Sequence, residues 1–533
     1  MVITKPFSSY ILKKNMWRDG FMEFKMCSLP ASGKSIISNA NTTVQSDIIV
    51  PDTKPDIFKV LAVKSVVDLA DSHIKKDKIN FSGKIRHNIL YVGEENPTNI
   101  CTIEYSTPFG CVCEKNGITE DTAIKYGCGV TKSLCEVVNS RKISVEANVE
   151  IQINAIDISK TEVISGEEIP ESLAYKSCEY SYDTLRASNR LEFVVSDTVD
   201  IGAGEGFEIY DIQAYNEVSE IKAVNNKAVI KGIVNVFILY NDDGKISGYS
   251  TEIPYTEIVD IENLASDQTL ISHFEISSVD YELPNDDDTV QMTVSIVIRG
   301  NIWGYAEESN TIATDIYSPD YAYDIRLNKC ILSKVSDVKE TRISVKDTLV
   351  STNPSSPISK VYCAWSDITK MESHISDGVV KIEGTMESTA IYCDEYDNLH
   401  SAKGVTPFET EIEFSFADKS CQALADASVI SSGFVMTSTS DIQIRTVIKL
   451  SSAIVSDAET QTITSFSLDE KSSVKKDEQP SILVYYPDDS KTLWDIAKKY
   501  NTTCEEIIDV NSLDKDNPII PGVPVLIPKR YVK

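Results

Sequence analysis

The chain has 533 residues, of which 42% are hydrophobic, so its length and composition suit three or four ordinary globular domains. It carries 51 Lys and Arg against 81 Asp and Glu, which gives a net charge of −30. That balance argues against a general nucleic-acid or anionic-membrane surface, because binding to phosphates needs clustered basic side chains. The negative charge also favours partners that are neutral or basic. No apolar run approaches the roughly 20 residues of a membrane-spanning helix, so we expect no transmembrane segment.

Residues 1–45 are expected to form an N-terminal segment without fixed structure. Residues 1–21 mix short apolar pieces with basic residues, but they contain no apolar core of signal-peptide length and no small-residue cleavage site. Met22 offers a second possible start of translation. The stretch ASGKS, Ala31–Ser35, ends like a phosphate-binding loop but lacks that motif's first glycine, so a plain loop is the better interpretation.

The first predicted domain, residues 46–157, is organised around the stretch INFSGKIRHNILY. Gly83 stands eight residues before Tyr91, with Ile85 and Ile89 at even spacing between them. Even spacing places these side chains on one face of an extended strand. The residues of the opposite face are polar, and they are Lys84, Arg86 and Asn88. The pattern therefore predicts a half-buried antiparallel strand with one wet face, and the domain ends on a second alternating strand, ISVEANVEIQI.

The pattern recurs at Gly232 with Tyr240 and at Gly384 with Tyr392, and the successive glycines stand 149 and 152 residues apart. That period is the length of a domain and is too long for a solenoid unit. Each copy is followed by a proline and an aromatic residue, namely Pro108–Phe109, Pro254–Tyr255 and Pro407–Phe408. We therefore predict a mainly β chain with three tandem β-rich, sandwich-like repeat domains at residues 46–157, 191–305 and 327–456, joined by linkers at 158–190 and 306–326.

The tyrosines, turns and cysteines of the repeats each have an ordinary structural interpretation. Each patterned Tyr is expected to cap the core of its own repeat, with a ladder of binding residues as the alternative. The acidic, Asn- and Gly-rich segments after the central strands predict hairpin turns, with a calcium site as the alternative. Five of the twelve cysteines lie in the first repeat without counterparts in the other copies, so reduced thiols are expected, with local cross-linking or metal capture as the alternative.

No set of catalytic residues emerges from the sequence. GAGEGF, Gly202–Phe207, is not a full dinucleotide-binding fingerprint and is interpreted as a turn. His87 shares the apolar face of its strand, but the matching positions carry Val236 and Ser388, which disfavours a recurring catalytic or metal role. The other four histidines have no partner at ligand spacing. We expect no enzyme activity, no metal and no cofactor.

The last part of the chain changes character. Residues 457–480 are polar and charged, which predicts a flexible linker. In residues 481–530 a short strand is followed by KTLWDIAKKY, whose apolar residues at i, i+3, i+4 and i+7 form one stripe of a helix that Ser490 is expected to cap. A second helix, with a capping box at Thr502 or Thr503, and a returning strand, VPVLIP, complete the order strand, helix, helix, strand.

This C-terminal pattern resembles a LysM domain over residues 482–528. LysM domains commonly bind N-acetylglucosamine chains in a shallow groove between the loop after the first strand and the loop before the last. By position, the resemblance implies a partner- or glycan-binding set of Ser490, Lys491, Thr492, Leu493, Trp494, Asn517, Pro518, Ile519, Ile520 and Gly522. The family usually has Gly-Asp-Thr where this chain has Ser490-Lys491-Thr492, so the local charge is reversed and a flexible glycine is lost.

Three such repeats followed by a terminal LysM domain resemble the sporulation proteins with SPOCS domains, the DUF3794 family, over roughly residues 46–530. The resemblance implies a non-enzymatic scaffold of spore coat assembly in the mother-cell cytoplasm, at the forespore surface. It also implies that the LysM domain binds a SpoIVA-like coat morphogenetic ATPase. The alternative is a peptidoglycan- or N-acetylglucosamine-binding protein of the spore cortex or cell wall.

Overall fold

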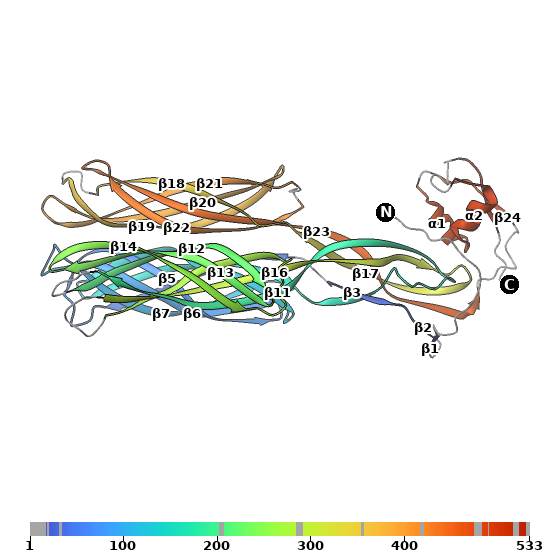
Figure 1. The fold of residues 1–533 in the computed structure, drawn as a ribbon, viewed down its shortest axis with the longest axis horizontal. Helices are drawn as coiled ribbons and strands as arrows, with labels where there is room; N and C mark the ends of the chain where they lie inside the picture. The colour runs from blue at the N-terminus through green and yellow to red at the C-terminus, as the bar shows by residue number, and fades with distance from the viewer. Residues whose placement is uncertain are drawn as a thin grey trace.

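The computed structural model describes residues 17–18, 21–30, 35–201, 207–283, 291–352, 356–415, 420–473, 482–488, 490–514 and 522–528. Within these ranges the chain is almost wholly antiparallel strand, with two short helices near the C-terminus (Figure 1). The predicted fold class, a mainly β chain of sandwich-like repeats followed by a small α+β domain, is therefore confirmed. Residues 31–34 of ASGKS and 202–206 of GAGEGF lie outside the described residues.

Each repeat folds into two three-stranded antiparallel sheets that pack face to face. In the first repeat, one sheet has the order β4-β9-β8 and the other has the order β5-β6-β7. These strands are β4 (Ser35–Ile49), β5 (Ile57–Lys75), β6 (Lys78–Gly93), β7 (Ile100–Glu114), β8 (Thr122–Asn139) and β9 (Lys142–Asp157). The predicted apolar faces meet between the sheets, where Ile85 of β6 and Val149 of β9 share one buried core.

The second and third repeats have the same strand order as the first. Their sheets are β11-β16-β15 with β12-β13-β14, and β18-β23-β22 with β19-β20-β21. The strands are β11 (Ala174–Asp200), β12 (Glu208–Val224), β13 (Lys227–Asp242), β14 (Lys245–Asp260), β15 (Thr269–Glu282), β16 (Gln291–Tyr317), β18 (Lys339–Val350), β19 (Ile358–Ser376), β20 (Val379–Asp394), β21 (Leu399–Glu413), β22 (Gln422–Met436) and β23 (Asp441–Ser473). Single-residue bulges also recur at matching places, at Leu61, Tyr210 and Tyr362 and at Thr131, Ser277 and Ile430. Shared irregularities of this kind are what copies of one sandwich are expected to show.

One contact explains both the glycine and the proline–aromatic pair of each repeat. Gly83 of β6 pairs directly with Phe109 of the edge strand β7, and a Cβ at Gly83 would come within 2.9 Å of the Phe109 ring. The same ring-on-glycine contact recurs as Tyr255 on Gly232 and as Phe408 on Gly384. The preceding proline stands on an edge strand, where a missing backbone donor is tolerated.

The patterned tyrosines are core residues, as predicted. Tyr91 and Tyr392 are fully buried. The Tyr91 hydroxyl donates to the Pro55 carbonyl at 3.0 Å, and the Tyr392 hydroxyl accepts from the backbone amide of Thr352 at 2.9 Å. Because each hydroxyl is bonded inside its own repeat, these rings close the ends of the cores and do not form a binding ladder.

The turns and cysteines show no metal or disulfide. In the third hairpin turn the Asp394 carboxylate accepts hydrogen bonds from the amides of Tyr396 and Asn398 and from the Ser356 hydroxyl. No group of three or more His, Cys, Asp or Glu in the described part of the chain is placed to hold a metal ion. All twelve cysteines are free thiols.

The three sandwiches form a closed ring. β5 of the first repeat contacts β15 of the second, β12 of the second contacts β22 of the third, and β19 of the third contacts β8 of the first. Charged contacts cross each junction, namely Lys64 to Asp211 at 3.3 Å, His273 to Asp426 at 2.8 Å and Lys59 to His400 at 3.3 Å. Each repeat thus contacts the preceding repeat through one edge strand and the following repeat through another. This is the geometry of a head-to-tail ring that closes after three units.

Beyond the sandwiches, the outer strands of each repeat continue as a two-stranded ribbon. β3 (Met26–Pro30) pairs with β10 (Lys160–Ile164), the first half of β11 pairs with the second half of β16, and β17 (Tyr321–Val335) pairs with the second half of β23. The three ribbons pack together around shared apolar cores, and Leu29, Ile312 and Leu332 contribute one side chain from each ribbon. We call this unit the ribbon body; it lies between the sandwiches and the helical domain (Figure 1).

The ribbon body corrects several predicted boundaries. The segments 1–45, 158–190, 306–326 and 457–480 were predicted as unstructured or as linkers, but each contains a described part of a paired strand. The prediction is wrong for those strands, because their polar side chains face solvent while their partners lie more than 100 residues away. Further upstream, β1 (Trp17–Arg18) pairs with β2 (Phe21–Met22).

The C-terminal domain has the predicted order of strand, helix, helix and strand. β24 (Ile482–Tyr485) pairs with β25 (Val525–Pro528), and α1 (Leu493–Lys499) and α2 (Cys504–Asn511) pack on that pair. Thr492 caps α1 in a capping box with Asp495, so the prediction that Ser490 caps this helix is wrong by two residues. Thr503 and Glu506 form the capping box of α2, which was one of the two predicted pairs. Among the described residues, neither helix is long and apolar enough to cross a membrane.

Candidate functional site

The loop between β24 and α1 holds the first half of the predicted binding set. Ser490 donates to the Asp488 carboxylate through both its amide and its hydroxyl, at 2.9 and 2.6 Å, so this loop is a tight local turn. Lys491 is exposed at its tip. The Thr492 hydroxyl and amide both contact the Asp495 carboxylate, which lowers the pKa of Asp495. The described part of the loop is thus stiffened by its own side chains, with the exposed Lys491 at its tip.

The structure describes only part of the second half of the predicted binding set. Gly522 has a φ of +78° and donates its backbone amide to the Pro487 carbonyl at 3.0 Å, which joins the two predicted groove loops. A positive φ is strained for other residues, so glycine is required there for this contact. Leu493 is buried in the domain core and does not line an open surface. Asn517, Pro518, Ile519 and Ile520 lie outside the described residues.

Trp494 docks the helical domain onto the ribbon body. Its indole Nε1 donates to the Asp315 carboxylate at 2.7 Å, and its ring meets Tyr317 edge to face at a centroid distance of 4.8 Å. Lys498, one turn further along α1, binds the same carboxylate at 2.7 and 2.9 Å. The buried Tyr317 hydroxyl donates to the Thr502 carbonyl at 2.8 Å. We call these residues the latch; an edge-to-face ring pair alone contributes about 0.5–1.5 kcal/mol beyond its buried area.

The latch was not visible in the sequence. Asp315 and Tyr317 lie at the end of β16, in a segment that was predicted as a linker. They meet Trp494 across 179 residues of chain, and no local pattern indicates such a pairing. The sequence did indicate Trp494 as a contact residue, because it is an aromatic residue next to the buried stripe of α1.

The outward side of β24 is an exposed apolar strip. Ile482, Val484 and Tyr486 alternate along the strand and are 57, 52 and 65% exposed. The other side of the same strand packs on the helices through Leu483 and Tyr485. A two-stranded sheet with an uncovered apolar face is a natural contact surface, because single exposed apolar residues are common but an aligned row is not.

A polar cavity occupies the axis of the three-sandwich ring. Its volume is ≈ 980 Å³, and strands of all three repeats line it. Toward the turn end of the ring, the axis is closed by an apolar layer that includes Leu90, Leu239 and Ile391, which stand at matching positions of the three repeats. Below that layer the matching positions diverge, with Asn88, Phe237 and Thr389 followed by Arg86, Asn235 and Glu387. The predicted wet face is thus confirmed for Arg86, whereas Thr389 of the third copy is buried.

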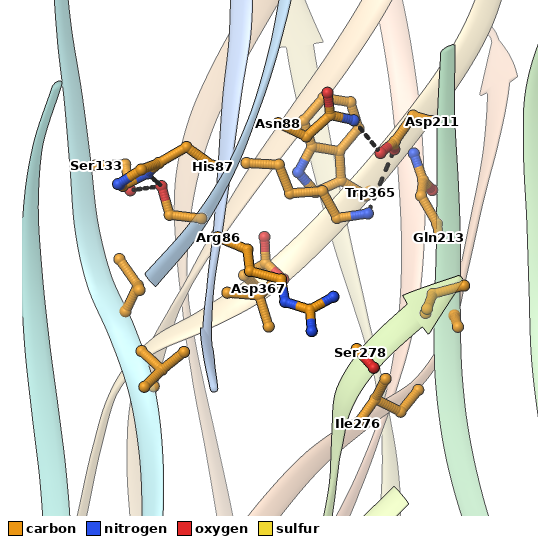
Figure 2. Close-up of a pocket in the computed structure, with 18 of the residues that line it drawn as sticks. Arg86, His87, Asn88, Ser133, Asp211, Gln213, Ile276, Ser278, Trp365 and Asp367 are labelled. Carbon is orange, nitrogen blue, oxygen red and sulfur yellow. Dashed lines mark hydrogen bonds and ion pairs between the residues drawn. The ribbon is translucent and has the colours of Figure 1, made fainter. Parts of the chain in front are cut away.

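Most charged groups of this axial cavity are paired inside the protein. Asp211 accepts from Lys64 at 3.3 Å and from the Asn88 amide at 2.9 Å (Figure 2). Lys403 binds Glu387 at 3.3 Å. Asp367 projects into the cavity, and its depth between the repeats raises its pKa, as do the neighbouring carboxylates of Glu387 and Asp211. Many of the charged side chains that line the cavity are therefore compensated by a partner within the protein.

Within the described part of the chain, three buried polar atoms of residues that line this cavity have no hydrogen-bond partner. They are Gln213 Nε2, His87 Nε2 and Asn88 Oδ1. Gln213 and His87 are each only 2% exposed. His87 Nδ1 contacts Ser65, and burial lowers the pKa of His87 to about 4, so the ring is neutral near pH 7. Sequence reasoning set His87 aside as a recurring metal ligand and did not single out Gln213 or Asn88.

Comparison with known families agrees with this domain content. A family model described as SipL, SPOCS domain, matches residues 56–138 and 207–284, which span β5–β8 and β12–β15. A LysM domain model matches residues 487–528. The third repeat lies outside the matched segments, although its strand order and bulges are those of the first two. Neither the curated proteins nor the solved structures contained a match to this chain.

Proposed function

Because the chain is SipL-like in its SPOCS segments and carries a C-terminal LysM domain, we propose that it is a scaffold of spore envelope assembly that binds a SpoIVA-like coat ATPase through that domain. SPOCS and LysM domains are non-catalytic binding domains, and together they make this a sporulation-related protein of the peptidoglycan-binding type. The proposed place of work is the mother-cell cytoplasm, around the forespore. The three proposed SPOCS repeats, at 46–157, 191–305 and 327–456, act as a rigid carrier of the LysM domain.

The observation that carries this proposal is the exposed strip of Ile482, Val484 and Tyr486. It is an apolar face of the LysM domain that the described part of the chain leaves uncovered. An apolar row rimmed by polar residues suits a protein partner, where buried aromatic and aliphatic side chains supply most of the binding energy. Lys491, at the tip of the adjacent loop, adds a cation, and this suits an acidic rim on that partner.

The rigid carrier is supported by the contacts that surround it. The three sandwiches close into a ring, and the latch fixes the LysM domain to the ribbon body. A fixed domain loses little orientational freedom on binding, so less of its interaction energy is spent on ordering. Where many copies of the partner are assembled, several chains bound side by side gain further from effective concentration.

A pull-down of the full chain with the purified SpoIVA-like ATPase tests the proposal. Val484→Asp places a charge in the strip and is expected to weaken binding at least tenfold. Ile258→Ala removes an exposed apolar side chain of β14 in the second repeat and serves as the matched control, with binding unchanged. Equal retention of the wild type and Val484→Asp contradicts the proposal.

The alternative function is binding of peptidoglycan or N-acetylglucosamine chains, and the two joined groove loops favour it. The Gly522–Pro487 contact brings together the segments that would flank a glycan. Ser490→Gly with Lys491→Asp restores the usual LysM loop. If the lost loop is what prevents glycan binding, this double variant co-sediments with purified peptidoglycan and the wild type does not. Co-sedimentation of the wild type itself favours the alternative.

A further inference from the structure

The axial cavity differs from the rest of the repeat structure in how its residues diverge among the three copies. Positions that build the sandwiches are alike, as the glycines, covering rings and buried tyrosines show. One step below the apolar layer, strands β5, β12 and β19 carry Lys64, Gln213 and Trp365 at matching places in the ladder. The copies thus keep the framework of the sandwich while the residues that face the shared cavity differ from one copy to the next.

Buried polar groups without a hydrogen-bond partner make this cavity unfavourable for the stability of the folded chain. Gln213 Nε2 is a donor without an acceptor, and Asn88 Oδ1 is an acceptor without a donor. His87 Nε2 is also unpartnered among the described residues, but the His87 side chain lies on the sandwich side of β6, opposite Asn88, and is not part of this pair. Buried groups of this kind destabilise a fold unless something bonds to them.

The ion pairs that line the cavity favour an uncharged ligand. Lys64 with Asp211 and Lys403 with Glu387 are already paired across or within repeats. Arg86 lies between Asp68 and Asp280 at 3.6 and 3.5 Å, which are ion-pair distances longer than hydrogen bonds, and its guanidinium projects into the cavity (Figure 2). A charged ligand would compete with these pairs, whereas a hydroxyl accepts from Arg86 without displacing either carboxylate.

The mouth of the cavity adds apolar faces. Tyr105 of β7 and Tyr281 of β15 line it from two different repeats and are 42 and 40% exposed. Ring faces that flank amide and guanidinium groups suit a flat molecule with apolar faces and polar edges. The volume is at the upper end of the roughly 300–1,000 Å³ of ligand pockets, so it holds more than one ring of a small molecule.

We propose that the axial cavity binds an oligosaccharide, with its hydroxyls bonded to Gln213, Asn88 and Arg86 and its sugar faces against Tyr105 and Tyr281. A sugar hydroxyl both donates and accepts, so one ligand class satisfies the free donor and the free acceptor together. The site is separate from the LysM groove and belongs to the repeats, at the junction of all three.

Saturation-transfer NMR and titration calorimetry of the full chain with maltotetraose, cellotetraose and chitotetraose test this, with tetra-alanine as the peptide probe. At least one oligosaccharide is expected to bind. Gln213→Leu and Tyr105→Ala should each weaken that binding at least fivefold. Tyr396→Ala, on an exposed turn of the third repeat, should leave it unchanged.

Gln213→Leu keeps the size of the side chain and removes an unmet donor, so it is expected to fold. Its thermal midpoint is measured alongside, and Tyr105→Ala, at the exposed mouth, gives a second result that does not depend on the core. Three outcomes overturn the proposal: none of the oligosaccharides binds, only tetra-alanine binds, or both cavity variants keep wild-type affinity.

Discussion

The three sandwiches and the LysM domain are held in the molecule in opposite ways. Each sandwich touches both of its neighbours, so the ring is secured by three junctions and an apolar layer on its axis. The LysM domain is held mainly at one place, where Trp494 and Lys498 share the Asp315 carboxylate. Distributed contacts survive the loss of one member, whereas a single latch does not. We therefore expect the ring to lose stability in steps and the LysM domain to be released by one change.

The largest effect is expected from the axial apolar layer. Ile391→Ala removes a fully buried side chain at the point where the three repeats meet, and large-to-small changes of this kind cost about 2–5 kcal/mol. The urea midpoint of the β-sheet signal should fall. The ring should nevertheless stay closed in buffer, with unchanged protease resistance of the LysM domain. Opening of the ring without denaturant would show that its junctions are not distributed.

The next largest effect is expected at the latch. Trp494→Ala removes the ring contact with Tyr317 and the hydrogen bond to Asp315, a loss of roughly 2 kcal/mol, as for central aromatic residues of interfaces. Hydrogen exchange at α1 and in the second half of β16 should rise, while the urea midpoint of the ring stays constant. Tyr486→Ala, exposed on the same domain, is the matched control. Unchanged exchange in Trp494→Ala would mean that other contacts hold the domain.

A pH dependence is expected at the junction of the second and third repeats. Burial lowers the pKa of His273, but the carboxylates of Asp426 and Glu275 outweigh it and raise the pKa above its ordinary value of 6.5. The charged imidazole therefore stabilises the folded chain fully below about pH 6.5, and this contribution is lost as the pH rises through the folded-state pKa. The urea midpoint should fall from pH 6 toward pH 10.

His273→Gln is the control for this pH effect. It should lower the midpoint at pH 6 and flatten its decline at alkaline pH, because the variant has no imidazole to discharge. Lys125, on β8 of the first repeat, also faces Asp426, and its pKa is lowered by burial, so it discharges at alkaline pH as well. A residual slope in His273→Gln is therefore expected, and a full wild-type slope contradicts the assignment to His273.

The smallest expected effect is a gain in stability. Without ligand, Gln213→Leu is expected to raise stability by about 1 kcal/mol, because an unmet buried donor costs that order of free energy. Thermal unfolding of the wild type and the variant measures it. The sign matters more than the size, because a gain in stability would show that the Gln213 side chain costs folding free energy when the cavity holds no ligand.

The repeat framework was predictable because its signals are local. Gly83 and Tyr91 sit on one strand, and Phe109 lies on the neighbouring strand of the same hairpin, so spacing along the chain reports the contact. The bulges were not predictable from the sequence. The ladder places Val60 opposite Tyr91, directly before the bulge at Leu61, as it places Ile209 opposite Tyr240, directly before the bulge at Tyr210.

The ribbon body, the latch and the axial cavity were not predictable, because each depends on residues far apart in the chain. β17 and the second half of β23 pair across more than a hundred residues without a turn between them, and their polar outer faces are indistinguishable from linker sequence. Trp494 could be singled out as an exposed aromatic, but Asp315 gives no sign of being its acceptor. The cavity combines strands of three repeats, so its polar residues appear in the sequence as ordinary solvated faces.

The ribbons also give the molecule a direction. Every repeat is entered and left through its ribbon, so all crossings between repeats are gathered beside the LysM domain, and the opposite extremity consists of hairpin bends and loops alone (Figure 1). A chain tethered by its LysM domain therefore points those bends outward from whatever it is fixed to. Insertions or fused tags placed there extend the far tip without crossing the tether, and a layer of such chains presents one uniform outer surface.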